Sequence, residues 1–191
     1  MVHSILDAAY RLLKTEGATT FTTNHVAAEA GVSVGSVYQY FASGDAIVAA
    51  VFERGLMQAE GALRSFLPLA ATQPPDELFQ QGFDTLVDLL LPYRQVIAEL
   101  LRVLPLFSSE SMLTLLETQL MNLSRDYLVL LQGRYVVDGG LSTLYVAVNS
   151  TAYAFLKWLV DQPPSVPQDE FKAALVGMMT RVYVPPQTLS E

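Results

Sequence analysis

The chain has 191 residues, 51% of them hydrophobic, which is enough to bury a core in one large domain or in a small domain joined to a medium one. Its formal net charge of -8 argues against a general binder of nucleic acids or anionic membranes, although a small basic patch stays compatible with it. Because the chain has no cysteine, disulfides, thiolate metal sites and a thiol nucleophile are excluded.

The amino terminus does not read as a signal peptide. Its first residues, MVHSILDAAYRLL, carry Asp7 and Arg11 at helical spacing instead of a basic start and a continuous apolar run, so we expect a cytoplasmic protein. The stretch 139–156 has no charged residue and reaches the lower limit of a membrane-spanning length. Polar residues within it, and Lys157 and Asp161 soon after it, favour a buried helix, so no membrane partner is expected.

Apolar residues recur with the 3.6-residue period along almost every segment, which predicts an all-α protein of about nine helices. Three short helices come first: residues 4–15, a second that starts at Thr22 and stops at Gly31, and a third from Ser33 to about Phe41. The hydroxyls of Thr22 and Ser33 can accept a hydrogen bond from an unpaired backbone N–H of the first turn. Gly31 permits the backbone conformation that ends a helix.

Longer helices follow, and prolines and glycines separate them. A connecting helix over residues 45–66 is expected to join two lobes. The further helices are expected at residues 76–91, 94–104 and 110–132, after Gly139-Gly140 in a helix that contains the uncharged stretch, and at residues 168–183. We therefore divide the chain into a small domain, residues 1–44, and a larger one, residues 45–191.

The small domain has the spacing of a helix-turn-helix around the turn Ala30-Gly31-Val32-Ser33, a motif whose second helix lies in the major groove of DNA. Apolar residues stand where such a unit needs a shared core: Val26, Ala27, Ala30, Val32, Val37 and Phe41. The other face of the third helix would present Val34, Gly35, Ser36, Tyr38, Gln39 and Tyr40. An ordinary helical hairpin with Tyr38 in its core is the alternative.

Many positions in this region resemble the amino-terminal signature of the TetR family of transcriptional regulators. They are Ile5-Leu6-Asp7-Ala8-Ala9, Gly17, Thr22, Val26-Ala27, Ala30-Gly31-Val32-Ser33, Gly35-Ser36-Val37-Tyr38, Tyr40-Phe41 and Ala46-Ile47-Val48. The resemblance implies a homodimeric, ligand-responsive repressor, with DNA binding in residues 1–44 and ligand binding and dimerisation in residues 45–191. It makes Val34, Gly35, Ser36, Tyr38 and Tyr40 groove-facing residues. Thr22 and Ser33 would then donate hydrogen bonds to phosphates.

The charge of this region departs from the family. The family usually has a lysine where this chain has Gly44, and no lysine or arginine occurs from Thr15 to Glu53. Since neutralised phosphates supply most nonspecific affinity, weak binding with a shallow salt dependence is expected. Three explanations stay open: a basic arm missing from the numbered sequence, neutral donors combined with dimer avidity, or lost DNA binding. His25 could add charge when protonated, although an exposed residue near a helix cap is the plainer interpretation.

The larger domain offers candidates for a lipophilic ligand pocket, namely Phe83, Tyr93, Phe107, Met121, Asn149 and Tyr153, although most apolar positions there must be core. Asn149 stands within the uncharged helix, where it contacts either a ligand or another helix. Few basic residues occur in this region, so we expect a neutral or cationic ligand, and no cofactor or metal. Asp84 and Asp88 lie one turn apart and could attract a cation, or simply form a solvated face.

The last two helices are predicted to form the dimer interface as a four-helix bundle about a twofold axis. The residues expected there are Leu144, Val148, Ala152, Phe155 and Leu159 of the uncharged helix, and Phe171, Leu175 and Met178 of the last one. A monomer in which these helices complete only the chain's own core is the alternative.

The sequence therefore predicts a repressor that binds a palindromic operator in double-stranded DNA as a homodimer and is released by a small lipophilic ligand. The first rival is a dimeric ligand-binding or protein-interaction module whose DNA unit is weakened or lost. The second rival is an enzyme, which the sequence does not support. Its two histidines, His3 and His25, both lie near the amino terminus, and it has no metal-ligand spacing and no nucleophile-elbow motif.

Overall fold

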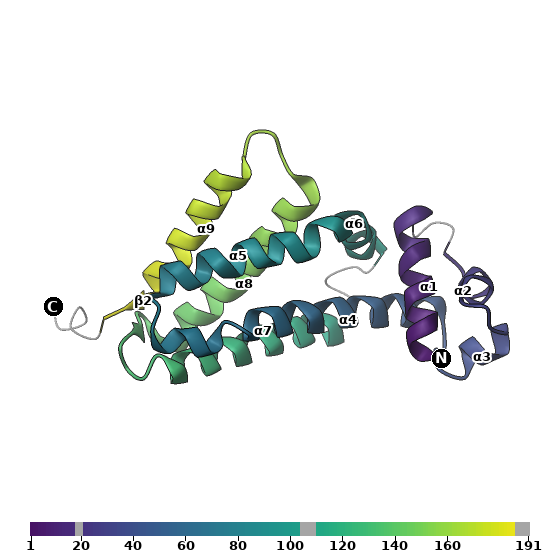
Figure 1. Cartoon of the computed structure of the whole chain (residues 1–191), viewed down its shortest axis with the longest axis horizontal. Helices are drawn as coiled ribbons and strands as arrows, with labels where there is room; N and C mark the ends of the chain where they lie inside the picture. The colour runs from purple at the N-terminus through teal and green to yellow at the C-terminus, as the bar shows by residue number, and fades with distance from the viewer. Residues whose placement is uncertain (18–20, 104–109, 186–191) are drawn as a thin grey trace. The chain divides into compact units, whose positions relative to one another are not determined.

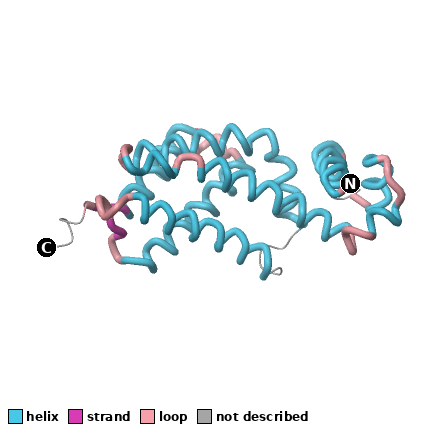
Figure 2. The backbone as a smooth tube through the Cα atoms, turned by 60° about the horizontal axis from the view of Figure 1, so that its bottom comes forward, coloured by secondary structure: helices cyan, strands magenta, loops and turns pink. Residues whose placement is uncertain are grey.

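The computed structural model of the protein describes residues 1–17, 21–103 and 110–185, which hold the helices α1 to α9 and very little strand (Figures 1 and 2). Two compact units divide the chain. The N-terminal unit comprises Met1–Gln58 together with the segment Pro92–Leu113, and the C-terminal unit comprises Ala59–Leu91 and the chain from Thr114 onward. The predicted all-α fold is confirmed.

In the N-terminal unit, α1 (Val2–Thr15), α2 (Thr23–Ala30) and α3 (Val34–Tyr38) pack with α6 (Arg94–Val103) and with the part of α4 (Gly44–Arg64) that precedes Ala59. The 3.6-residue spacing of α1 puts its apolar side chains on one face, and these are buried: Ile5, Leu6, Ala8, Ala9, Leu12 and Leu13. Val26, Val37 and Ile47 close the same core and are fully buried. This core fixes α2 and α3 relative to each other.

In the C-terminal unit, α5 (Pro75–Leu90) packs against α9 (Gln168–Val182), which in turn packs against α8 (Gly140–Asp161) (Figure 1). The helix α7 (Glu110–Leu130) and the short 3₁₀ helix η1 (Leu67–Ala71) add to this unit, and a second 3₁₀ turn, η2 (Leu91–Tyr93), follows α5. The chain after α9 returns as β2 (Tyr183–Val184), which pairs antiparallel with β1 (Val136–Val137), Val137 opposite Tyr183. Figure 2 shows this pair in magenta among the helices.

An aromatic cluster joins α5, α8 and α9. The rings of Trp158 and Phe171 stack at 4.9 Å between centroids. Phe83 meets Phe155 edge to face at 5.6 Å and lies 5.9 Å from Trp158. Trp158 also donates a hydrogen bond from Nε1 to the carbonyl of Val166 in the loop before α9, so the cluster fixes that loop as well. Aromatic pairs of this geometry add stability beyond the area that they bury.

Several predicted boundaries need correction. The helix α3 ends at Tyr38 rather than near Phe41, because Tyr40 N–H bonds to the carbonyl of Val37 in a tighter i to i+3 turn. The helix α8 contains the uncharged stretch and runs to Asp161, which includes the predicted position Leu159, and Gln162 ends it in a left-handed conformation with φ of 40°. The pairing of β1 with β2 was not predicted, since two-residue strands carry no sequence period.

The packing division also falls later than residue 44. Val48, Val51 and Phe52 of α4 are buried in the core that α1 and α2 share, so the first half of α4 belongs to the N-terminal unit. The assignment of residues 1–44 to DNA binding concerns function and stays a prediction. Among the helices in the described part of the chain, none is long and apolar enough to cross a membrane.

Candidate functional site

Two capped helix starts define the helix-turn-helix. The Thr22 hydroxyl accepts a hydrogen bond from the backbone N–H of His25 at 3.2 Å, and the Ser33 hydroxyl accepts one from Ser36 N–H at 3.0 Å. Gly31 ends α2 in the left-handed region, with φ of 67° and ψ of 32°. The predicted caps and stop are therefore confirmed, and they set the turn between α2 and α3.

The outer face of α3 is neutral and aromatic. Tyr38 and Tyr40 are 54% and 49% exposed, so the alternative in which Tyr38 is a core residue is wrong. Gly35 and Gln39 are exposed beside them, and a Cβ atom at Gly35 would meet nothing closer than the Ser33 hydroxyl at 3.8 Å. A partner can therefore approach the backbone of α3 closely.

Two of the predicted groove-facing residues are only partly available. Val34 is half-buried and packs against the core of the N-terminal unit. Ser36 is half-buried as well, and its hydroxyl lies 2.8 Å from that of Ser33. These two hydroxyls therefore satisfy each other in the free protein, and a phosphate would have to share or displace their hydrogen bond.

One hydrogen bond orients the most exposed ring of α3. The Tyr38 hydroxyl lies 3.2 Å from the Thr23 hydroxyl in the first turn of α2. Thr23, which stands next to the Thr22 cap, was not among the predicted site residues. The contact ties the tip of the Tyr38 side chain to α2, so its hydroxyl keeps a defined position on the face that α3 presents.

The cations of this region are mostly paired. The Arg11 guanidinium lies 2.6 Å from Glu29 of α2, and Arg54 lies 2.7 Å from Asp7 of α1. Lys14 makes no ion pair within the described residues. The N-terminal unit thus offers DNA little positive charge that is not already engaged.

The structure places the predicted ligand residues apart. Phe83 is buried in the aromatic cluster and Met121 in the core that β1 and β2 adjoin, whereas Tyr153 is 59% exposed on α8. Tyr93 packs edge to face on Tyr10 in the N-terminal unit, where burial raises the pKa of Tyr10. Phe107 lies outside the described residues.

The polar candidates of the C-terminal unit bond within the protein. The Asn149 amide donates to the carbonyl of Tyr145 one turn earlier in α8, at 2.9 Å. Both carboxylate oxygens of Asp84 accept from Lys172 Nζ of α9, at 2.7 and 2.6 Å. Asp84 therefore binds a cation that the chain itself supplies.

The predicted dimer residues include four that are wrong. Leu144, Val148, Phe155 and Leu159 are at most 6% exposed within the single chain, so they pack its own core and present no surface to a partner. Ala152, Phe171 and Leu175 are half-buried, and Met178 is 41% exposed. Of the predicted set, Met178 offers the most surface to a second copy.

A different stripe of α8 is exposed. Leu141, Tyr145 and Tyr153 recur at multiples of four residues, and Val146 lies beside them; their exposed fractions run from 44% to 62%. The signal was present in the sequence, because the stretch 140–156 has no charge on either face, which favours cover on both sides. The predicted interface took residues of the inner face instead.

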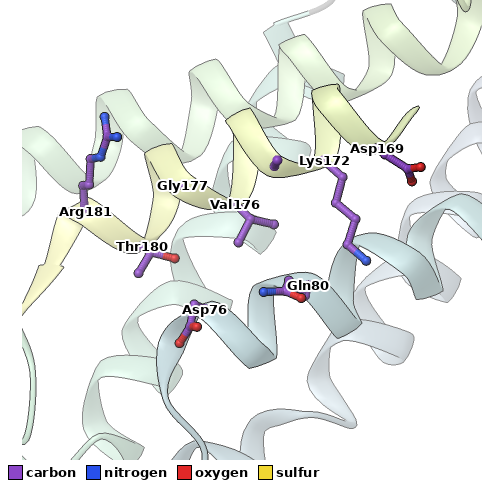
Figure 3. Close-up of a pocket in the computed structure, with 9 residues that line it drawn as sticks. Asp76, Gln80, Asp169, Lys172, Val176, Gly177, Thr180 and Arg181 are labelled. Atoms are coloured by element: carbon purple, nitrogen blue, oxygen red, sulfur yellow. The ribbon is translucent and has the colours of Figure 1, made fainter. Parts of the chain in front are cut away.

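A cavity of about 560 Å³ lies between α5 and α9 (Figure 3). Asp76 and Gln80 line it from α5. The residues that line it from α9 are Asp169, Lys172, Ala173, Val176, Gly177, Thr180 and Arg181. None of the five predicted ligand residues that the structure describes belongs to this lining.

The comparisons with known proteins agree with the helix-turn-helix geometry. Residues 5–51 match the family model described as bacterial regulatory proteins, tetR family. Residues 5–51 thus match the amino-terminal helix-turn-helix region of that family, and the resemblance found in the sequence is confirmed. No curated protein matches the chain.

Solved structures with the same fold cover nearly the whole chain. A TetR-family transcriptional regulator from Streptomyces coelicolor has 21% identity and a TM-score of 0.64, over 95% of this chain and 98% of that one. The multidrug binding protein EbrR, complexed with imidazole, has 19% identity and a TM-score of 0.68, over 98% and 97%. The fatty acid degradation regulator FadR from Bacillus halodurans has 15% identity and a TM-score of 0.61, over 95% and 93%. The chain therefore has the fold of TetR-family transcription regulators along most of its length.

Proposed function

We propose that the protein is a transcriptional repressor that binds a palindromic operator in double-stranded DNA as a homodimer and that a small lipophilic ligand releases it. The match of residues 5–51 to the tetR family, together with the exposure of Tyr38 at the end of α3 and of Tyr40 in the turn after it, carries this proposal. Such a regulator acts in the cytoplasm and is not an enzyme.

Neutral groups supply the contacts in this proposal. Tyr38, Tyr40 and Gln39 can bond to phosphates or base edges, and the tyrosine rings can pack on thymine methyl groups. The exposed N–H groups at the start of α2, beside Thr22, add donors for a phosphate. Since each subunit binds weakly, affinity depends on two subunits engaging at once.

The second copy is proposed to cover the exposed stripe of α8, defined by Leu141, Tyr145, Val146 and Tyr153, together with Met178 of α9. An exposed apolar stripe of this kind marks an association surface. With two helices from each subunit, the interface would be a four-helix bundle about a twofold axis.

The ligand assignment rests on likeness in fold to EbrR, a multidrug binding protein, and to FadR, a regulator of fatty acid degradation. A neutral or cationic lipophilic compound would shift α4, which runs from the N-terminal unit into the C-terminal unit. Because half-sites must lie about 34–36 Å apart, a small shift of α4 in each subunit would break the match.

Replacement of Tyr38 by alanine tests the DNA contact. Binding to labelled random-sequence duplexes at low salt should weaken by about tenfold, because each subunit loses one polar contact. The sedimentation coefficient should stay that of the wild-type dimer, since Tyr38 is exposed. Equal DNA binding by both proteins would refute the assigned face of α3.

The shortage of positive charge supports one alternative, a dimeric ligand-binding or protein-interaction module without DNA binding. From Thr15 to Glu53 the chain has neither lysine nor arginine. A folded dimer that shows no affinity for DNA duplexes even at the lowest salt would favour this alternative.

A further inference from the structure

We propose that the groove between α5 and α9 binds a small molecule through its ammonium group, with Asp76 as the principal contact. Val176 contributes an apolar side chain to the lining, and polar side chains line it from both helices. Figure 3 shows Asp76 and Gln80 on α5, and Thr180 on the facing helix α9. The site is separate from the predicted lipophilic pocket, so the inference goes beyond the proposed function.

The charges of the groove favour a cation. Lys172 is neutralised by the two oxygens of Asp84. Arg181 also lines the groove. The carboxylates of Asp76 and Asp169 make no ion pair within the described residues, so two carboxylates stand against one guanidinium and the lining keeps a net negative charge. A carboxylate attracts a cation more strongly where an apolar surface excludes water from around the two charges.

A buried hydroxyl of the lining lacks a partner. The Thr180 hydroxyl oxygen is covered and has no hydrogen-bond partner in the described structure. The Tyr127 hydroxyl, which does not belong to the lining, has none either, and burial is the main cause of its raised pKa. Buried polar atoms without partners are rare in folded proteins and call for an explanation.

Thr180 fits an ammonium ligand in a specific way. The Thr180 hydroxyl makes no hydrogen bond inside the protein, so rotation about the Cα–Cβ bond can turn it toward the groove without breaking one. A primary ammonium carries three N–H donors, which match the Asp76 carboxylate, the Gln80 amide oxygen and the Thr180 hydroxyl. The carbon chain of such an amine would lie over Val176.

A less specific role for Asp76 predicts different behaviour. Asp76 stands in the first turn of α5, where a negative charge interacts favourably with the helix dipole. Glu77 stands in the same turn and does not line the groove. The variants Asp76→Asn and Glu77→Gln therefore remove the same helix contribution, and only the first removes the proposed ligand contact.

The test is a titration of the full chain with butylammonium chloride, followed by the backbone amide signals of α5 and α9 in NMR spectra. We expect saturable shifts at residues 76–80 and 176–181 in the wild type and in Glu77→Gln. Asp76→Asn should bind about tenfold more weakly or worse, because it loses a charge-assisted hydrogen bond. Butanol, which has the same carbon chain and no charge, should cause no saturable shift.

A second variant keeps the proposal falsifiable if Asp76→Asn fails to fold. Thr180→Val preserves the shape of the side chain and should weaken butylammonium binding severalfold without lowering the unfolding temperature, since the hydroxyl has no internal partner. Equal binding by the wild type and either variant, shifts centred outside the groove, or no saturable binding would overturn the proposal. No DNA is present in these titrations, so their failure is distinct from failure of the DNA-binding function.

Discussion

A lysine at position 44 should make DNA binding tighter and more dependent on salt. A Cβ atom at Gly44 would meet ring carbons of Phe21 at 3.8 and 3.9 Å, which is ordinary van der Waals contact. Gly44 begins α4, so the added cation costs about 0.3–1 kcal/mol of stability against the helix dipole. The fold therefore accommodates Gly44→Lys, at a position where the family usually has a lysine.

The size of the effect follows from the available cations. Lys14 is the one cationic side chain of residues 1–44 without an ion pair in the described structure, because Arg11 is paired with Glu29. Lys14 of each subunit can neutralise one phosphate, and two neutralised phosphates per dimer give a slope of about -1.8 in a plot of log affinity against log salt concentration. The wild type should therefore lose only about tenfold between 50 and 200 mM salt, and Gly44→Lys about a hundredfold.

The assay is fluorescence anisotropy of a labelled duplex over a range of potassium chloride concentrations at one fixed pH. Asn122→Lys, which adds the same charge at an exposed position of α7, is the control and should leave the slope near that of the wild type. A wild-type slope typical of about six to ten phosphate contacts would refute the neutral interface. An unchanged slope in Gly44→Lys would refute the placement of residue 44 beside DNA.

Three further predictions concern hydrogen bonding and stability. Thr23→Val removes the partner of the Tyr38 hydroxyl and should weaken duplex binding severalfold while Thr23→Ser preserves it; equal loss in both variants would show that the hydroxyl contact is unimportant. Phe83→Ala should lower the free energy of unfolding by about 3–5 kcal/mol, because Phe83 is buried among three aromatic rings. The control Val129→Ala, at an exposed site, should change the free energy of unfolding by about 0.5 kcal/mol or less. Both can be measured by urea unfolding with the fluorescence of Trp158, the single tryptophan. Burial raises the pKa of Tyr127 and Tyr183, so the folded protein keeps protons that the unfolded chain releases above pH about 10. The free energy of unfolding should therefore be independent of these groups below that pH and fall above it. The fall should be smaller in Tyr127→Phe. A free energy of unfolding that rises above pH 10, or a large loss of stability at neutral pH in Tyr127→Phe, would contradict the buried, unpaired hydroxyl.

Local signals predicted the helix-turn-helix well. The cap residues Thr22 and Ser33 and the stop at Gly31 act through bonds to neighbours three or four residues away, so the sequence contains the whole interaction. The exposure of Tyr38 followed from the same helical period that buried Val37.

Signals that depend on distant partners were not predictable in the same way. The uncharged helix α8 has two apolar faces, and the period alone does not say which one meets α5 and α9; the prediction took Leu144 and Val148 for the outer face and was wrong. The pairing of Asp84 with Lys172, 88 residues later, and the groove between α5 and α9 likewise arise only when the helices pack.

Selection of duplexes from a random-sequence pool by the purified protein at low salt tests the central claim most directly. If the chain is a dimeric reader of DNA, the selected sequences should contain an inverted repeat whose half-sites lie about one helical turn apart, 34–36 Å, and Tyr38→Ala should fail to enrich it. A folded dimer that enriches no inverted repeat would contradict the account and leave a ligand-binding or protein-interaction module.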